Sequence, residues 1–191
     1  MSAYKSWIAA FALIVAMLAA TGCQVSGQVE QGRVIAYDKK TGVVTLIPEA
    51  STADLPGVLP PLAVKLPEDP EEMGPAPSAG KLIRLEAGKR RLVVFDAAEQ
   101  VFRTIPYTPL EERRKLAKSP SAPPVDRVKK TITVYSPEQR LAVTFAASDD
   151  LLAMPADTWK SGDVIRYYYQ QPGQALRLMN VTKTDLSKSG S

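Results

Sequence analysis

Three consecutive tyrosines beside arginines are the residues of this sequence best suited to recognition chemistry. Arg166, Tyr167, Tyr168 and Tyr169 follow one another, and Arg177 stands on the segment expected to return beside them. Successive side chains of a strand alternate between its faces, so Arg166 and Tyr168 should share one face and the other two tyrosines the opposite one. This candidate binding surface would suit a sugar, an anionic lipid headgroup or a protein partner. Cross-strand aromatic packing between two sheets is the structural alternative.

A cluster of four carboxylates is the second group with chemical potential. Glu68, Asp69, Glu71 and Glu72 could bind calcium or supply the acid–base pair of a glycoside hydrolase. Their spacing is not that of an EF-hand, and three prolines lie among and around them. This composition favours a solvated surface loop, so we predict no metal site.

The composition excludes most familiar catalytic machinery. The 191 residues include no histidine and one cysteine, which rules out a Ser-His-Asp triad, an internal disulfide and a multi-cysteine metal site within one chain. We therefore expect no catalytic residue and no cofactor. The 24 basic and 20 acidic residues give a net charge of +4, which is no case for nucleic-acid binding. With 45% hydrophobic residues, the chain should form a packed core.

The amino-terminal segment has the features of an export signal. Lys5 is followed by an apolar run over residues 7–20, which is short for a membrane span. The sequence LAATGC over residues 18–23 resembles the lipobox of bacterial lipoproteins, although Ala20 stands where leucine is more usual in that family. The resemblance implies that a lipid is attached to the thiol of Cys23. A plain secretory signal and an uncleaved anchor helix are the alternatives.

The same resemblance implies a location. Signal cleavage between Gly22 and Cys23 would remove residues 1–22 and leave residues 23–30 as a lipidated tether. In that family an aspartate directly after the cysteine tends to retain the protein in the inner membrane, and Gln24 stands there instead. We therefore expect a periplasm-facing protein of the cell envelope, anchored by lipid, with the outer membrane favoured. Its partners would be the membrane and an envelope protein or glycan.

Turn residues between short β-branched and aromatic segments predict four β-hairpins and a mostly β fold. Proline or glycine occurs in each predicted turn. The paired segments are 32–38 with 43–47, 81–86 with 91–96, 131–135 with 141–145, and 163–170 with 175–182.

The order of the hairpins suggests an internal duplication, because residues 78–84 and 160–166 have similar residue types after similar hairpins. Chance likeness of two β regions is the alternative. The sequence TPLE over residues 108–111 has the form of a capping box and predicts a short helix. We predict two small antiparallel units, barrel-like or sandwich-like, joined by that helix. The predicted order is a first β unit over 31–107 with a proline-rich insertion over 48–79, a helix and linker over 108–126, a second β unit over 127–186, and a disordered tail over 187–191.

From Tyr37 and Asp38 to residues 178–183, the chain also resembles short uncharacterised lipoproteins of sulfate-reducing bacteria. That resemblance implies no activity, cofactor or functional residue. Two classes of function remain. The first is a non-catalytic, lipid-anchored protein that binds or scaffolds through a β surface. The alternative is a carboxylate-dependent hydrolase of envelope glycan, which needs two carboxylates about 5–9.5 Å apart in one pocket.

Overall fold

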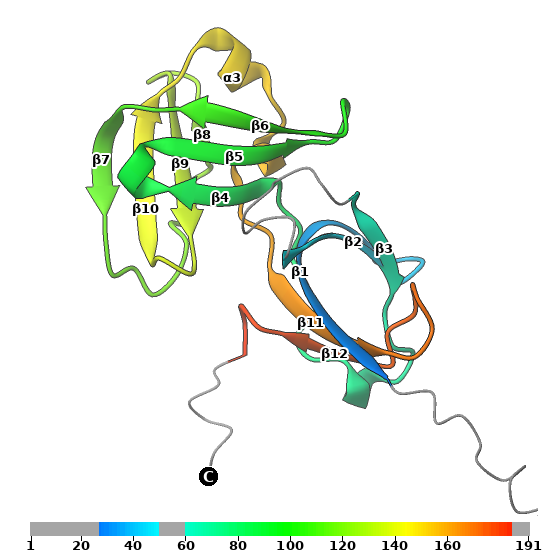
Figure 1. Cartoon of the computed structure of the whole chain (residues 1–191). Helices are drawn as coiled ribbons and strands as arrows, with labels where there is room; N and C mark the ends of the chain where they lie inside the picture. Colours follow the sequence, from blue (N-terminus) through cyan, green and yellow to red (C-terminus); the bar gives the residue numbers. More distant parts are fainter. Residues whose placement is uncertain (1–26, 50–59, 185–191) are drawn as a thin grey trace, which may run out of the picture.

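A computed structural model describes residues 27–49 and 60–184. These residues form twelve strands in three antiparallel sheets, one α-helix and three 3-10 helices (Figure 1), which confirms the predicted mostly β class. The signal segment, Cys23, residues 24–26 of the tether, residues 50–59 of the proline-rich insertion and the 187–191 tail lie outside the described residues. Within the part of the chain that the structure describes, no helix has the length and apolar character needed to cross a membrane.

The elements follow one another in this order: β1 (Gln28–Asp38), β2 (Val43–Pro48), β3 (Leu62–Lys65), η1 (Pro70–Glu72), β4 (Leu82–Glu86), η2 (Ala87–Lys89), β5 (Arg91–Asp96), β6 (Val101–Pro106), β7 (Pro109–Arg113), β8 (Val125–Asp126), β9 (Thr131–Ser136), β10 (Leu141–Ala146), α3 (Asp149–Ala153), η3 (Ala156–Trp159), β11 (Val164–Tyr169) and β12 (Arg177–Asn180).

Sheet A contains both the first and the last strands, in the order β12-β11-β1-β2-β3. Its central strand, β1, pairs with β11 over its first half and with β2 over its second. Gly32 lies where the two pairings overlap. A Cβ there would be 2.6 Å from the side chain of Leu46 and 2.7 Å from the carbonyl oxygen of Ile47. Because real Cβ atoms do not approach so closely, the bend of β1 over β2 requires glycine.

Sheet A curls around its own core. Its edge strand β3 meets the turn after β11, where the Lys65 N–H donates to the Gly173 oxygen at 2.8 Å and the Ala175 N–H donates to the Lys65 oxygen at 2.9 Å. Figure 1 shows the resulting ring of strands. The buried side chains inside it are Val34, Val44, Leu46, Val64, Leu66, Ile165, Tyr167, Tyr169, Ala175 and Leu178.

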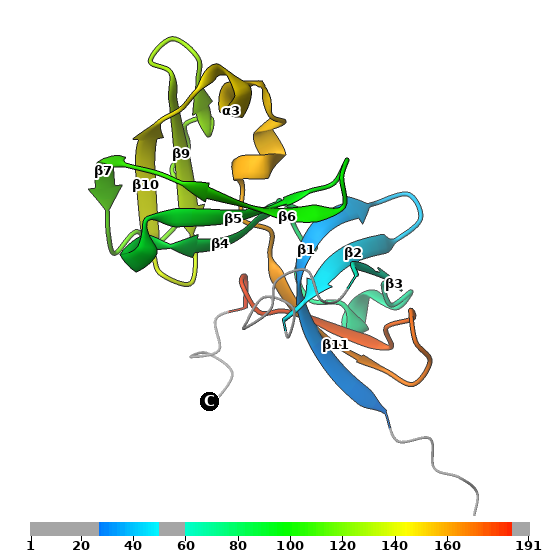
Figure 2. The same cartoon turned by 45° about the horizontal axis from the view of Figure 1, so that its top comes forward.

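Sheets B and C form a sandwich beside sheet A (Figure 2). Sheet B has the order β4-β5-β6 and sheet C the order β7-β10-β9-β8. Leu92 and Val94 of sheet B and Val143 of sheet C belong to one buried cluster, which Leu152 of α3 and Trp159 of η3 complete. Each fully buried side chain of this kind contributes about 1.5–3 kcal/mol to stability.

Two adjacent chain segments join sheet A to the sandwich. Residues 78–81 lead from sheet A into β4, and residues 160–163 lead back into β11. The Asp163 N–H donates to the Ser78 oxygen at 2.9 Å, so the outgoing and returning segments are hydrogen-bonded to each other. A separate apolar cluster packs sheet A against sheet B and consists of Ile35, Ile47, Ile83, Val93 and Phe95, with Phe102 beside it.

The predicted helix after Thr108 is wrong. Pro109–Arg113 is β7, an edge strand that pairs with β10 from Ala142 to Phe145. The capping-box pattern describes only local hydrogen bonds, and so short a helix is marginal without tertiary support. The unpaired edge of β10 offers a ladder of backbone hydrogen bonds instead, and an edge strand tolerates a proline.

The four predicted hairpins are confirmed, but their grouping into units is not the predicted one. β1–β2, β4–β5, β9–β10 and β11–β12 all pair as antiparallel neighbours. However, β11 pairs with β1, so the carboxyl-terminal hairpin joins the amino-terminal one, and the middle of the chain forms the sandwich. The predicted boundaries at residues 107 and 127 therefore both fall inside the sandwich.

Candidate functional site

The predicted tyrosine surface is divided between the two faces of sheet A. Tyr167 and Tyr169 point into its core, where they are 3% and 8% exposed and their ring centroids lie 5.4 Å apart. Both hydroxyls donate to the carboxylate of Glu30, at 2.6 Å and 2.7 Å. Burial and the hydrogen bond to Glu30 raise the pKa of both tyrosines. Burial is the larger cause for Tyr167, and the hydrogen bond is the larger cause for Tyr169. These two tyrosines thus hold β11 against β1, and they are not part of an exposed binding surface.

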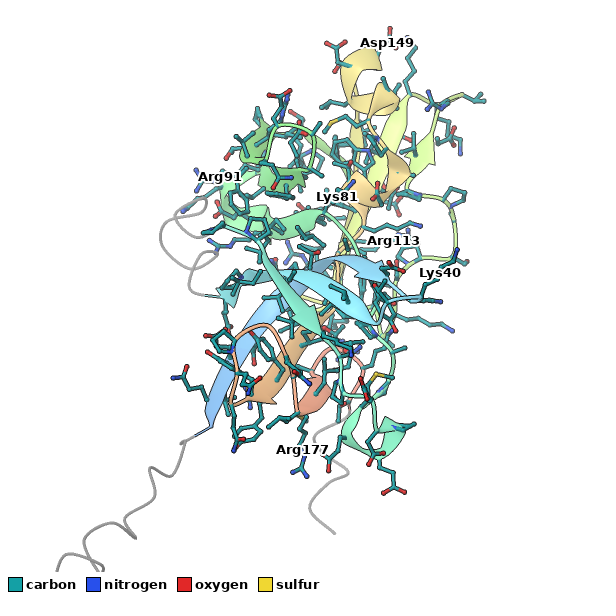
Figure 3. The ribbon with its side chains drawn as sticks, turned by 90° about the vertical axis from the view of Figure 1, so that its right-hand side faces the viewer. Lys40, Lys81, Arg91, Arg113, Asp149 and Arg177 are labelled. Carbon is teal, nitrogen blue, oxygen red and sulfur yellow. The ribbon has the colours of Figure 1, made fainter. Side chains whose placement is uncertain are left out.

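The remaining three residues of the predicted surface lie on the outer face of sheet A. Arg166 donates twice to Gln31, at 2.9 Å and 3.1 Å. Tyr168 is paired in register with Arg177 on β12, and both line a hollow of about 490 Å³. Figure 3 shows Arg177 at the end of sheet A that is remote from the sandwich, beside η1. The charge of Arg177 is already compensated, because its guanidinium forms an ion pair with Glu72.

Three of the four carboxylates of the acidic cluster have partners within the protein instead of being arranged around a cation. Glu72 pairs with Arg177, and Glu68 lies 2.7 Å from the ammonium of Lys65. These bonds lower the pKa of both carboxyls. Asp69 caps η1 by accepting the Glu71 N–H at 2.9 Å. Among residues 27–49 and 60–184, no three potential metal ligands of the Asp, Glu, Cys or His type lie together.

A cavity of about 620 Å³ lies at the junction between sheet A and the sandwich, and we call it the junction cavity. The two connecting segments form one side of it and the loop before β8 forms the other. Its lining combines hydroxyl groups, proline rings and two aromatic side chains. The lining residues are Ser78, Ala79, residues 119–124, Thr133, Tyr135, Pro137, Ala156, Trp159, Lys160, Ser161 and Asp163.

The aromatic side chains of the junction cavity are fixed in place. Tyr135 is partly buried, and its hydroxyl donates to the Leu116 oxygen at 3.2 Å. Trp159 is 1% exposed and packs edge-to-face on Phe145, with ring centroids 6.2 Å apart. The cavity therefore has one partly accessible ring in its wall and a rigid aromatic residue beneath.

Two serine hydroxyls of the cavity accept hydrogen bonds from cations. Ser161 Oγ accepts from Arg33 Nη1 at 3.1 Å, and Ser78 Oγ accepts from Lys183 Nζ at 2.8 Å. A hydroxyl that accepts in this way still has its own O–H to donate. Lys160 also lines the cavity, and its ammonium makes no ion pair or side-chain hydrogen bond with another described residue. Two hydroxyl groups with free O–H donors and an exposed lysine without an ion-pair partner therefore belong to the lining of the cavity.

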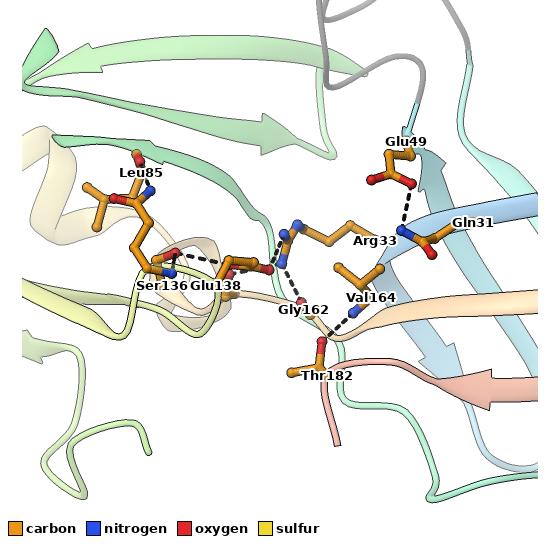
Figure 4. Close-up of polar contacts among 11 residues, drawn as sticks. Gln31, Arg33, Glu49, Leu85, Ser136, Glu138, Gly162, Val164 and Thr182 are labelled. Carbon is orange, nitrogen blue, oxygen red and sulfur yellow. Dashed lines mark hydrogen bonds and ion pairs between the residues drawn. The ribbon is translucent and has the colours of Figure 1, made fainter. Parts of the chain in front are cut away.

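Arg33 ties the two units together beside this cavity (Figure 4). From β1 its guanidinium donates to the Gly162 oxygen at 2.7 Å, to Ser161 Oγ at 3.1 Å and to the Glu138 carboxylate at 2.6 Å. Its side chain is 12% exposed, and that of Glu138, in the β9–β10 turn, is 46% exposed. Burial alone would raise the pKa of Glu138, but the charge of Arg33 and its hydrogen bond outweigh burial and lower this pKa.

We expect Arg33→Met to lower the free energy of unfolding by about 3 kcal/mol at neutral pH and Glu138→Gln by about 1 kcal/mol. The larger effect follows because the first change removes all three hydrogen bonds, whereas the second leaves two in place and affects a half-exposed carboxylate. Denaturant unfolding measures both. The matched control is Lys129→Met, whose ion pair with Asp126 is exposed and should cost at most about 0.5 kcal/mol. Equal losses for Arg33→Met and Lys129→Met would contradict the role of Arg33.

The same pair predicts a pH dependence with a definite sign. Because the pKa of Glu138 is lowered by folding, its contribution is complete above its unfolded pKa of about 4.3 and decreases as the pH falls through the folded value. The stability difference between the wild type and Glu138→Gln should therefore be largest near neutral pH and shrink in acid. A difference that stays constant from neutral pH to strong acid would exclude the ion pair as its source.

The geometry provides little for catalysis. Asp163, which is 6% exposed, is the one carboxylate among the residues that line the junction cavity. Its Oδ2 already accepts the Ser78 N–H at 2.7 Å and lies 3.0 Å from the Lys183 ammonium. That ammonium also contacts Ser78 Oγ, but a lysine engaged in an ion pair has no lone pair with which to accept the serine proton.

A family model described as a domain of unknown function, DUF4881, matches residues 26–189. The chain belongs to this family. The DUF4881 match spans sheet A and the sandwich alike, so both units and the junction between them are parts of the family's domain. No curated protein and no solved structure matches the chain.

The junction cavity of this DUF4881 domain was not predicted from the sequence. Residues 119–124 have the composition of a linker, and residues 160–163 that of a turn before a strand. The cavity exists because β11 returns to β1, which brings residues 160–163 beside residues 78–81. The clearest signal in the sequence was a small residue followed by glycine, which occurs in both 78–84 and 160–166. The two glycines lie where the connecting segments pack closely against each other.

Proposed function

We propose that this DUF4881 protein is a lipid-anchored, periplasm-facing protein of the cell envelope that binds an envelope ligand without transforming it. The observation that carries the binding role is the junction cavity. Its volume of about 620 Å³ lies in the range of small-molecule sites, and its lining combines apolar walls with a few polar groups.

The lipobox resemblance supports the location. β1 begins at Gln28, five residues after Cys23. At about 3.3–3.6 Å per extended residue, this tether keeps the start of sheet A within roughly 18 Å of an acylated Cys23. The protein would therefore act close to the membrane surface, where the outer membrane is the favoured site because Gln24 follows the cysteine. An envelope glycan or protein within that reach is the proposed partner.

A hydrolase of envelope glycan is the alternative. It would need a carboxylic acid that stays protonated near neutral pH to serve as the general acid. Every described carboxyl group whose pKa clearly departs from its ordinary value is shifted downward. A shift in this direction keeps a carboxyl ionised, so none of these seven carboxyl groups has the raised pKa that a general acid needs.

Incubation with isolated peptidoglycan sacculi tests the proposal. We expect the purified protein to sediment with the sacculi and to release no soluble fragments, because the cavity binds without a paired acid and base. Sedimentation and chromatography of the supernatant measure the two outcomes, with a known glycan hydrolase as the positive control for release. Fragments that accumulate with time and enzyme concentration would establish the hydrolase instead.

A further inference from the structure

We propose that the junction cavity binds a sugar that carries a carboxylate group. The inference deepens the proposed function and rests on it, because the proposed partner includes an envelope glycan. The proposal depends on the hydroxyl donors of the cavity, on the lysine of its lining that has no ion-pair partner, and on its apolar walls.

The donors come from two adjacent segments. Ser78 lies on the outgoing segment and Ser161 on the returning one, and these segments are hydrogen-bonded to each other. Each hydroxyl accepts from a cation, Lys183 in one case and Arg33 in the other, and so keeps its proton for a ligand. An acceptor-rich group with two oxygen atoms, such as a carboxylate, matches a pair of O–H donors.

The charge balance favours a single negative charge. Arg33 is neutralised by Glu138, and Lys183 is neutralised by Asp163. Lys160 is the lining cation that makes no ion pair with another described residue. One ammonium and two hydroxyls suit a monoanionic carboxylate. A phosphate group is usually bound by clustered guanidinium groups, and the residues that line the junction cavity include no arginine.

The walls favour a sugar over a small inorganic or aliphatic acid. Tyr135 and the prolines of residues 119–124 provide flat apolar surface, while Ser119, Ser121 and Thr133 provide hydroxyl groups. A pyranose ring has an apolar face and a polar rim, which match such a mixed lining. The pyranose ring would lie against Tyr135, and its carboxylate would bind Lys160.

Titration of the purified full chain with two related sugars tests this inference. N-acetylmuramic acid carries a carboxylate, and N-acetylglucosamine is the same amino sugar without it. Backbone NMR shifts should change at Ser78, Lys160 and Ser161 with the acid, which should bind about tenfold more tightly than the neutral sugar. Lys160→Gln should reduce the affinity for the acid about tenfold and leave that for the neutral sugar unchanged.

The control variant is Lys129→Gln, which removes an exposed lysine from the β8–β9 loop and should change neither affinity. Equal affinities for the two sugars, an unchanged affinity in Lys160→Gln, or the absence of shifts at the three residues would each overturn the inference. This titration does not depend on the anchor. A protein without acylation that still discriminates between the sugars would refute the proposed location and leave the carboxylate site intact.

Discussion

Replacing Cys23 by alanine is expected to abolish lipid attachment, so that the variant either keeps its signal segment or becomes soluble. The physical reason is the size of the anchor: buried methylene groups contribute about 0.8 kcal/mol each, so two or more acyl chains hold a protein essentially permanently. We expect wild-type protein from a Gram-negative host to have the mass of the chain from Cys23 plus acyl groups and to fractionate with the outer membrane. Cys23→Ala should show no acyl mass.

The control for this experiment is Ser26→Ala, a neighbouring polar change that leaves the lipobox intact. It should have the acyl mass and the location of the wild type. Wild-type protein that is cleaved elsewhere and soluble would contradict the lipobox interpretation and leave a plain secretory signal. Wild-type protein that keeps residues 1–22 would indicate an uncleaved anchor helix.

The predicted hairpins are correct because the information that specifies them is local. Gly42 and Gly173 both adopt positive φ, at +67° and +83°, and lie in the turns where the sequence predicted them. A turn that requires such a backbone conformation favours glycine and fixes the register of the strands on either side. The alternation of Arg166, Tyr167 and Tyr168 between faces is predictable for the same reason, since it follows from the pleat alone.

The partners of those hairpins depend on information that no local window contains. β1 pairs with β11 across more than 130 positions of sequence, with Gln31 opposite Arg166. The side chains on these strands would fit a neighbouring hairpin equally well by composition. What decides the pairing is the closure of the sheet A core around Tyr167 and Tyr169 over Glu30. The helix prediction at 108–111 was wrong for the same reason, because the open edge of β10 is not visible in that segment.

The site could be predicted only in part. Tyrosines and arginines are conspicuous in a sequence, yet Tyr167, Tyr169 and Arg177 are engaged by Glu30 and Glu72. Much of the lining of the junction cavity consists of serines, prolines and a lysine that have an ordinary appearance in the sequence. They acquire a common chemistry only when the chain crosses from one unit to the other and back.

Gly162 lies on the segment by which the chain returns to sheet A, and we expect Gly162→Ala to destabilise the protein strongly. A Cβ at this buried position would overlap the carbonyl oxygen of Val34 and lie 2.9 Å from its carbonyl carbon and 3.0 Å from the Gly80 nitrogen. All three atoms belong to backbone, which cannot move aside as a flexible side chain would. We expect a loss of about 3 kcal/mol or more, which corresponds to a fall in Tm of roughly 6–12 °C for a protein of this size.

Gly88→Ala is the matched control. Gly88 lies in η2, and a Cβ there would meet no atom within 4 Å. The substitution should leave Tm unchanged or raise it slightly, since alanine restricts the unfolded chain. Thermal unfolding followed by circular dichroism compares the two variants directly. If Gly162→Ala melted at the temperature of Gly88→Ala, the returning segment could not pack against β1 and the outgoing segment as closely as the structure places it. The cavity that depends on their contact would then lose its physical basis.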